Sequence, residues 1–116
     1  MELKISEKEM RRLAEEYMLN MYKTGTDPVN YKILQMLPST TDKIRAGINR
    51  SKMPTNCRLH QLCKYGLASW RKGTAIVEKG ELTDKFLENI GRLLSDVEKD
   101  VMGNLKKNLV EYLLHD

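Results

Sequence analysis

Cysteine is scarce in this sequence, and its only two cysteines, Cys57 and Cys63, lie six positions apart in the middle of the chain. Two thiols cannot form the framework of disulfides that stabilises small secreted domains. The sequence also lacks any apolar run near the roughly 18 residues that a membrane span needs, and its charged first residues are unlike a secretory signal. These absences predict a protein of the reducing cytoplasm with no membrane partner.

The short motifs of common enzymes are missing as well. The sequence has no glycine-rich phosphate loop, no strained turn that presents a nucleophilic serine, and no Cys-x-x-Cys pair. Its carboxylates fall mainly on segments with helical periodicity, where solvated ion pairs are their ordinary role. We therefore expect a protein that is not an enzyme and that needs no cofactor.

What is present suits one small domain. The chain has 116 residues, of which 41% are apolar and 31% are charged. This length allows a single hydrophobic core, and the proportions are ordinary for a globular domain with a soluble surface. We expect one domain over residues 1–116.

The charge is concentrated in the centre of the chain. Residues 1–40 are neutral overall, residues 41–79 carry a net charge of +7, and residues 80–116 carry −3. A positive centre between neutral and acidic flanks is typical of a surface that binds a polyanion. The alternative is a solvated basic surface without a partner.

Two long helices are predicted at the ends of the chain. Ser6 stands three residues before a glutamate in the spacing of a capping box, and apolar residues then recur every three or four positions from Met10 to Tyr22. This pattern predicts an N-terminal helix within residues 1–25. Thr83 marks the start of a second long helix over residues 83–116. We expect Gly103 to weaken or kink this helix, because glycine is a poor helix former.

The sequence of the centre of the chain predicts three shorter helices and a hairpin. Helical patterns cover residues 27–37, 40–49 and 54–66. Asp27 before Pro28 predicts the N-cap of the first, and Asn49, which tolerates a left-handed conformation, predicts the end of the second. The pair Lys72-Gly73 then lies between two short apolar strands in residues 67–77, as in a tight turn. This order predicts a helix-turn-helix followed by a small β-hairpin.

The run from Thr40 to Leu67, TTDKIRAGINRSKMPTNCRLHQLCKYGL, resembles the two-helix core of archaeal and bacterial winged-helix transcription regulators. The resemblance extends over about residues 27–82. It implies a mainly α fold with a small β-hairpin wing, namely a winged helix-turn-helix flanked by N- and C-terminal helices. In this pattern Ile44 and Ile48 form the buried side of the first helix, and Leu59 and Leu62 anchor the second, the recognition helix.

Two positions depart from the family pattern. Arg50 stands where an apolar residue is usual, and Thr55 stands where valine or isoleucine is common. We expect the turn between the two helices to be reorganised, with Met53 supplying the missing apolar plug.

The resemblance and the basic centre together predict sequence-specific binding of double-stranded DNA by a transcriptional regulator. A helix fits the major groove, where base edges differ in their donors and acceptors, and cations hold the phosphates. Base contacts are expected from Asn56 and Arg58, and phosphate contacts from the approach to the recognition helix and from the wing. The residues expected at the DNA are Arg50, Ser51, Lys52, Asn56, Arg58, Arg71 and Lys72. The alternative is a winged-helix module that binds protein or RNA.

The central helix also contains Cys57, His60 and Cys63, whose spacing spreads them over about 120° of the helix surface. We expect no metal site here, although sensing of a metal or of redox state stays an alternative. Trp70 is expected to pack the hairpin against the core rather than to stack on a base.

The terminal helices predict a homodimer. Their apolar stripes exceed what a small core can cover, and a large exposed apolar patch is unusual on a soluble monomer. A two-fold pair would bury these stripes and place two recognition helices about one DNA turn apart. In the competing account the chain reverses at Gly103, and the last helix folds onto its own core.

Overall fold

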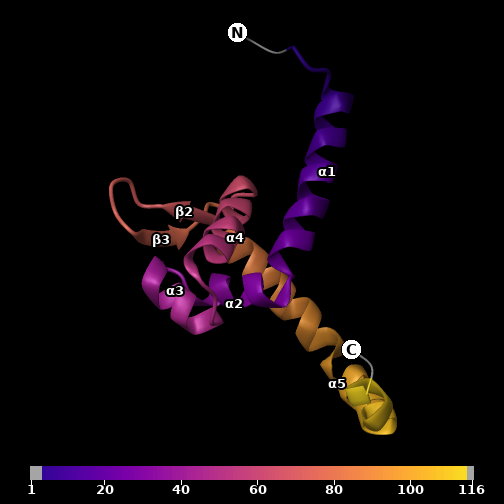
Figure 1. The fold of residues 1–116 in the computed structure, drawn as a ribbon. Coiled ribbons are helices and arrows are strands. Elements are labelled where there is room, and N and C mark those ends of the chain that lie inside the picture. Colours follow the sequence, from indigo (N-terminus) through magenta and orange to yellow (C-terminus); the bar gives the residue numbers. More distant parts are fainter. Residues whose placement is uncertain (1–3, 115–116) are drawn as a thin grey trace. The chain divides into compact units, whose positions relative to one another are not determined.

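The protein is mainly helical and contains one small antiparallel sheet (Figure 1). The computed structural model describes residues 4–114, and the chain divides into two units, residues 1–84 and residues 85–116. None of the helices in the described part combines the length and the apolar character needed to cross a membrane.

The first helix, α1 (Glu7–Gly25), begins as the sequence predicts. The Ser6 hydroxyl accepts a hydrogen bond from the backbone N–H of Glu9 at 3.1 Å, which satisfies one free donor of the first turn. In a capping box the Glu9 carboxylate would accept from the backbone N–H of Ser6. Here it accepts hydrogen bonds from the guanidinium of Arg12. Most of the apolar side chains of α1 stay exposed, whereas Met21 is buried.

The second helix, α2 (Pro28–Met36), is capped by Asp27. One oxygen of the Asp27 carboxylate accepts from the backbone N–H groups of Val29 and Asn30 at 3.0 and 3.1 Å. The missing N–H of Pro28 costs nothing in the first turn, where it would have no helical partner. Ile33 and Leu34 of this helix are completely buried in the core.

The two helices α3 (Thr41–Ile48) and α4 (Lys52–Lys64) follow the predicted order. Asn49 ends α3 in the left-handed conformation, with φ of 54°, a conformation that asparagine tolerates better than most residues. The apolar sides of both helices are buried as expected, through Ile44, Ile48, Leu59 and Leu62. However, α4 begins at Lys52 and not at Pro54, so the turn is shorter than predicted.

The predicted role of Met53 is wrong, because its side chain is 77% exposed. Thr55 fills the core position itself. It is completely buried, and its hydroxyl donates to the backbone carbonyl of Ser51 at 2.8 Å. A buried hydroxyl is tolerated where it has such a partner, so no apolar plug is needed.

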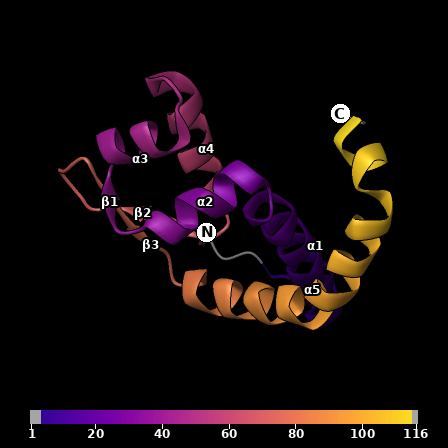
Figure 2. The ribbon, with the colours of Figure 1, turned by 90° about the horizontal axis from the view of Figure 1, so that it is seen from below.

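Three strands form the sheet in the order β1-β3-β2. The predicted hairpin consists of β2 (Ala68–Trp70) and β3 (Ile76–Lys79), which pair antiparallel with Trp70 opposite Val77. The sequence analysis did not predict β1 (Ser39–Thr40), a two-residue strand that pairs with the other side of β3. The backbone N–H of Thr41, at the start of α3, donates to the carbonyl of Ala75 at 3.0 Å, and Figure 2 shows the hairpin beside the start of α3.

The two ends of the hairpin meet at Gly66 and Gly80. A Cβ atom at Gly80 would lie 2.1 Å from the carbonyl oxygen of Gly66, so only glycine fits there. The Thr83 hydroxyl accepts from the N–H of Gly80 at 2.8 Å and donates to the carbonyl of Leu67 at 2.5 Å. Thr83 does begin the last helix, but its hydroxyl joins the hairpin ends instead of capping the helix.

The second unit consists of the rest of α5 (Thr83–Leu114), which bends along its length in Figure 2. The predicted break at Gly103 is wrong, since the non-helical backbone lies at Asn108, with φ of −121° and ψ of 24°. The Asn108 amide donates to the carbonyl of Asn104 at 3.2 Å. An asparagine side chain that bonds the backbone in this way competes with helical hydrogen bonds. The helix therefore continues through Gly103, and the chain does not reverse there.

Candidate nucleic-acid interface

A groove of about 410 Å³ brings together α3, the start of α4 and the hairpin. Lys52 and Asn56, both expected at the DNA, lie one turn apart on α4 and line this groove. Lys52 is exposed and Asn56 is half-buried. The other lining residues are Thr41, Asp42, Arg45, Trp70, Thr74 and Ala75. The helix pair and the hairpin thus share one concave surface.

A second groove, of about 430 Å³, lies at the turn between α3 and α4. It is lined by Arg50 and Ser51, also expected at the DNA, together with Arg45 and Asp42. The guanidinium of Arg50 donates to the carbonyls at the end of α3, at 3.3 Å to Ile48 and 3.2 Å to Asn49. Ser51 makes no side-chain hydrogen bond to the first turn of α4, which leaves the positive end of that helix without a side-chain cap.

The hairpin turn carries Arg71 and Lys72. The guanidinium of Arg71 donates to one carboxylate oxygen of Glu78 on β3, from Nη2 at 2.5 Å and from Nε at 3.1 Å. Lys72 is exposed and forms no ion pair with any residue in the range 4–114. The turn of the hairpin therefore presents one neutralised cation, Arg71, and one available cation, Lys72.

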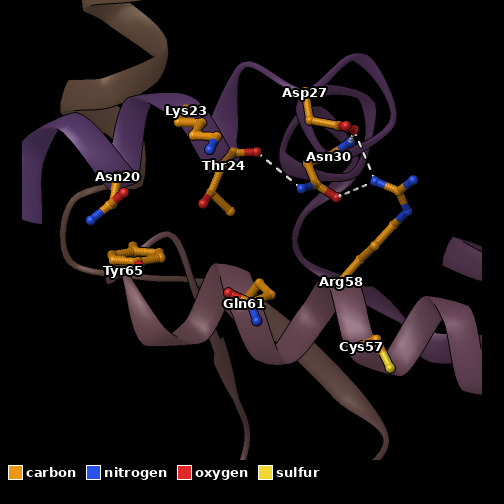
Figure 3. A pocket seen from close by; sticks show the side chains of 9 residues that line it. All are labelled: Asn20, Lys23, Thr24, Asp27, Asn30, Cys57, Arg58, Gln61 and Tyr65. Carbon is orange, nitrogen blue, oxygen red and sulfur yellow. Dashed lines mark hydrogen bonds and ion pairs between the residues drawn. The ribbon is translucent and has the colours of Figure 1, made fainter.

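Arg58 lies on a different side of α4 from the first groove, toward α2 (Figure 3). Its guanidinium donates to the Asp27 carboxylate at 2.8 Å and to the side-chain oxygen of Asn30 at 3.0 Å. Asn30 is only 6% exposed, and its amide donates to the carbonyl of Thr24 at 3.0 Å. These bonds join the end of α1, the start of α2 and the middle of α4.

The electrostatics of this network favour the charged pair. Partial burial acts to raise the pKa of Asp27, but the backbone N–H of Asn30 and the Arg58 guanidinium together hold that pKa below its ordinary value. The carboxylate is therefore ionised at neutral pH. Arg58, which the sequence analysis expected at base edges, is engaged within the protein.

A surplus of positive charge remains after the ion pairs are counted. Of the nine cations in residues 41–79, four form ion pairs: Arg45, Arg58, Arg71 and Lys79. The other five have no ion pair within the described residues, namely Lys43, Arg50, Lys52, Lys64 and Lys72. Exposed pairs neutralise charge at short range without removing the net field of the segment.

The cysteines do not form a site with their neighbours. Cys57 is exposed and Cys63 is half-buried, and burial raises the pKa of the Cys63 thiol. No group of three possible metal ligands occurs within residues 4–114. His60 instead lies near Trp70, with 6.4 Å between the ring centroids.

Arg45 lines both grooves but is not among the residues expected at the DNA from the sequence. Its position on α3 contained a signal, because it follows the buried Ile44 and stands three residues before the buried Ile48. At about 100° per residue, a polar residue in this position lies at the flank of the buried stripe, where its side chain borders both the core and the surface. What the sequence could not indicate is that this side of α3 faces the hairpin.

Comparison with protein-family models, with curated proteins and with solved structures gave no match to this chain.

Proposed function

We propose that residues 27–82 form a winged-helix domain that binds double-stranded DNA in a sequence-specific manner, and that the protein acts as a transcriptional regulator. In this proposal α4 is the recognition helix and the β2–β3 hairpin is the wing. The order of elements from α2 to α5 supports it, as does the burial of Ile44, Ile48, Leu59 and Leu62 on the inner sides of α3 and α4.

One observation carries the proposal: the exposed start of α4, the turn before it and the hairpin converge on one grooved, cationic surface. A helix that enters the major groove uses the side chains near its N-terminus to reach base edges. The neighbouring cations and backbone N–H groups then hold the phosphates. Lys52 and Asn56 stand at that end of α4.

The residues have different roles in this arrangement. Asn56 is placed for base edges, since an asparagine side chain can both donate to and accept from an adenine. Arg50, Ser51 and Lys52 suit phosphates beside α4, while Lys72 suits a phosphate or the minor groove at the wing. Arg58 stabilises the position of the recognition helix, because its guanidinium donates hydrogen bonds to Asp27 and Asn30 on the side of α4 away from the groove.

A homodimer is the second part of the proposal. The side chains of Met10, Met18 and Leu19 on α1 are 53%, 49% and 65% exposed. On α5 the exposed apolar side chains continue to its end: Leu93, Leu94, Val97, Val101, Met102, Leu109, Val110, Tyr112, Leu113 and Leu114. A second copy of the chain would remove these surfaces from water, which is favourable in proportion to the apolar area buried.

Selection from a pool of random DNA duplexes tests the proposal. We expect enrichment of one motif, arranged as an inverted repeat with half-sites about one helical turn apart. A pool that stays random after several rounds would contradict sequence-specific binding. Retention of RNA hairpins in preference to duplex DNA would favour an RNA-binding module instead.

A further inference from the structure

The geometry points to Arg45 as a further DNA-contact residue that binds a backbone phosphate in the groove between α3, α4 and the hairpin. This inference rests on the proposed function, because it names a ligand group within the same surface. The ligand is a phosphodiester, which accepts hydrogen bonds and donates none.

Arg45 is weakly held by Asp42, its only ion-pair partner among residues 4–114. Its Nη1 lies 3.6 Å from a carboxylate oxygen of Asp42, and the two side chains are 38% and 90% exposed. This distance is too long for a good hydrogen bond, and so exposed a carboxylate is well screened by water. The guanidinium therefore keeps most of its capacity to bind another anion.

The Nε of Arg45 points to the same conclusion from a separate observation. This nitrogen is buried and has no hydrogen-bond acceptor in the part of the chain that the structure describes, and the same is true of the indole nitrogen of Trp70. Both residues line the groove. A buried donor without an acceptor is rare in proteins, since it has lost its water without replacement. An acceptor that enters the groove allows Arg45 to extend toward it and to recover the missing hydrogen bond.

The surroundings suit a phosphate better than a neutral acceptor. Lys52 adds a second cation on the α4 side of the groove, and Asn56 adds a side-chain amide. Lys52 is also the first residue of α4, whose start has no side-chain cap from Ser51, so the positive end of that helix lies beside the groove. Asp42 is the only carboxylate among the residues that line this groove. An arginine that turns from such a weakly bound carboxylate to a phosphate exchanges one ion pair for a charge-assisted, two-point contact.

The test compares four proteins: the wild type, Arg45→Ala, Asp42→Asn and Arg11→Ala. The binding of each to one fluorescently labelled duplex is measured by anisotropy over a salt series, and circular dichroism reports whether each is folded. Arg11 is the matched control, because it also forms an ion pair within one helix, with Glu7 at 2.9 Å, but lies outside the basic centre.

We expect Arg45→Ala to bind about tenfold more weakly at low salt and to reduce the slope of log affinity against log salt by about 0.9, the value of one phosphate contact. Asp42→Asn should bind more tightly, because it removes the charge that competes with the phosphate for Arg45. Arg11→Ala should match the wild type.

Wild-type affinity and slope in folded Arg45→Ala would overturn the inference while leaving the proposed function intact. If Arg45→Ala does not fold, Asp42→Asn decides, and an affinity equal to or below that of the wild type would overturn the inference. If the wild type binds no duplex, the proposed function fails, and the role of Arg45 fails with it.

Discussion

At the scale of single residues, α4 has two polar sides with different partners. Lys52 and Asn56 line the groove shared with the hairpin, whereas Arg58 bonds to Asp27 and Asn30 on the opposite flank. The first side is available to a ligand and the second is occupied by the protein. Substitutions on the two sides should therefore have different effects.

Arg58→Ala should act mainly on stability. Its loss leaves the nearly buried side-chain oxygen of Asn30 without this donor and the Asp27 carboxylate without its cation. We expect the free energy of unfolding, measured by urea denaturation, to fall by about 1–2 kcal/mol, because the Arg58 and Asp27 side chains are partly exposed to water. Arg11→Ala, at an exposed ion pair, is the control and should change it by less than about 0.5 kcal/mol. If Arg58→Ala left the free energy of unfolding unchanged but altered the preference among DNA sequences, Arg58 would contact base edges and would not be a stabilising residue.

Asn56→Ala and Lys72→Ala should affect two different quantities. The first is the preference for one DNA sequence over another, and the second is the affinity for any duplex. Asn56→Ala should reduce the difference in affinity between the selected duplex and a scrambled one, by about 1–3 kcal/mol for a lost two-point base contact. Lys72→Ala should weaken binding to both duplexes equally, because a phosphate carries no sequence information. Competition titrations with the two duplexes measure both effects. If both variants lost the same affinity for the selected and the scrambled duplex, Asn56 would not read the sequence, and the surface would be only a basic patch.

At the scale of elements, most of the helices could be predicted because their signals are local. The caps at Ser6 and Asp27 and the left-handed Asn49 lie where the sequence indicates. β1 could not be predicted, since two residues contain no period and only pairing with β3 makes them a strand. The hydrogen-bond partners of Arg58 also could not be predicted, because Asp27 is 31 residues away along the chain.

The position of the kink in α5 does not follow from the low helix propensity of glycine. Gly103 is a poor helix former, but a Cβ atom there would meet no neighbour within 4 Å, and the helix continues through it. At Asn108 the side chain bonds to the carbonyl of Asn104, and there the backbone departs from the helix. The competing hydrogen bond, rather than the lack of a side chain, marks the break.

Substitution of two glycines by alanine tests the packing of these elements. Gly80→Ala should lower the free energy of unfolding by about 3 kcal/mol or more, because its Cβ would collide with the backbone of Gly66. Gly103→Ala should raise it by about 0.5–1 kcal/mol, because alanine is a better helix former and has open space there. Thermal and urea unfolding measure both values. If Gly103→Ala lowered the free energy of unfolding, that result would contradict a helix that continues through residue 103.

At the scale of the whole molecule, the distribution of apolar surface predicts self-association. Exposed apolar side chains lie on both α1 and α5. Sedimentation equilibrium at micromolar concentration should therefore give a mass near twice the 13.5 kDa of one chain. Deletion of residues 104–116 should shift the equilibrium to the monomer. A dimer that survives this deletion would place the interface on α1, and a wild-type mass of one chain would exclude the dimer.

The central claim is that the basic centre of the chain binds the phosphates of duplex DNA. Five cations of this segment have no ion pair within the described residues, and each that reaches a phosphate releases counterions from the duplex. Measurement of duplex affinity between about 50 and 200 mM salt tests this directly, with an expected slope of about −4 for log affinity against log salt. An affinity that does not change over this range would contradict the account.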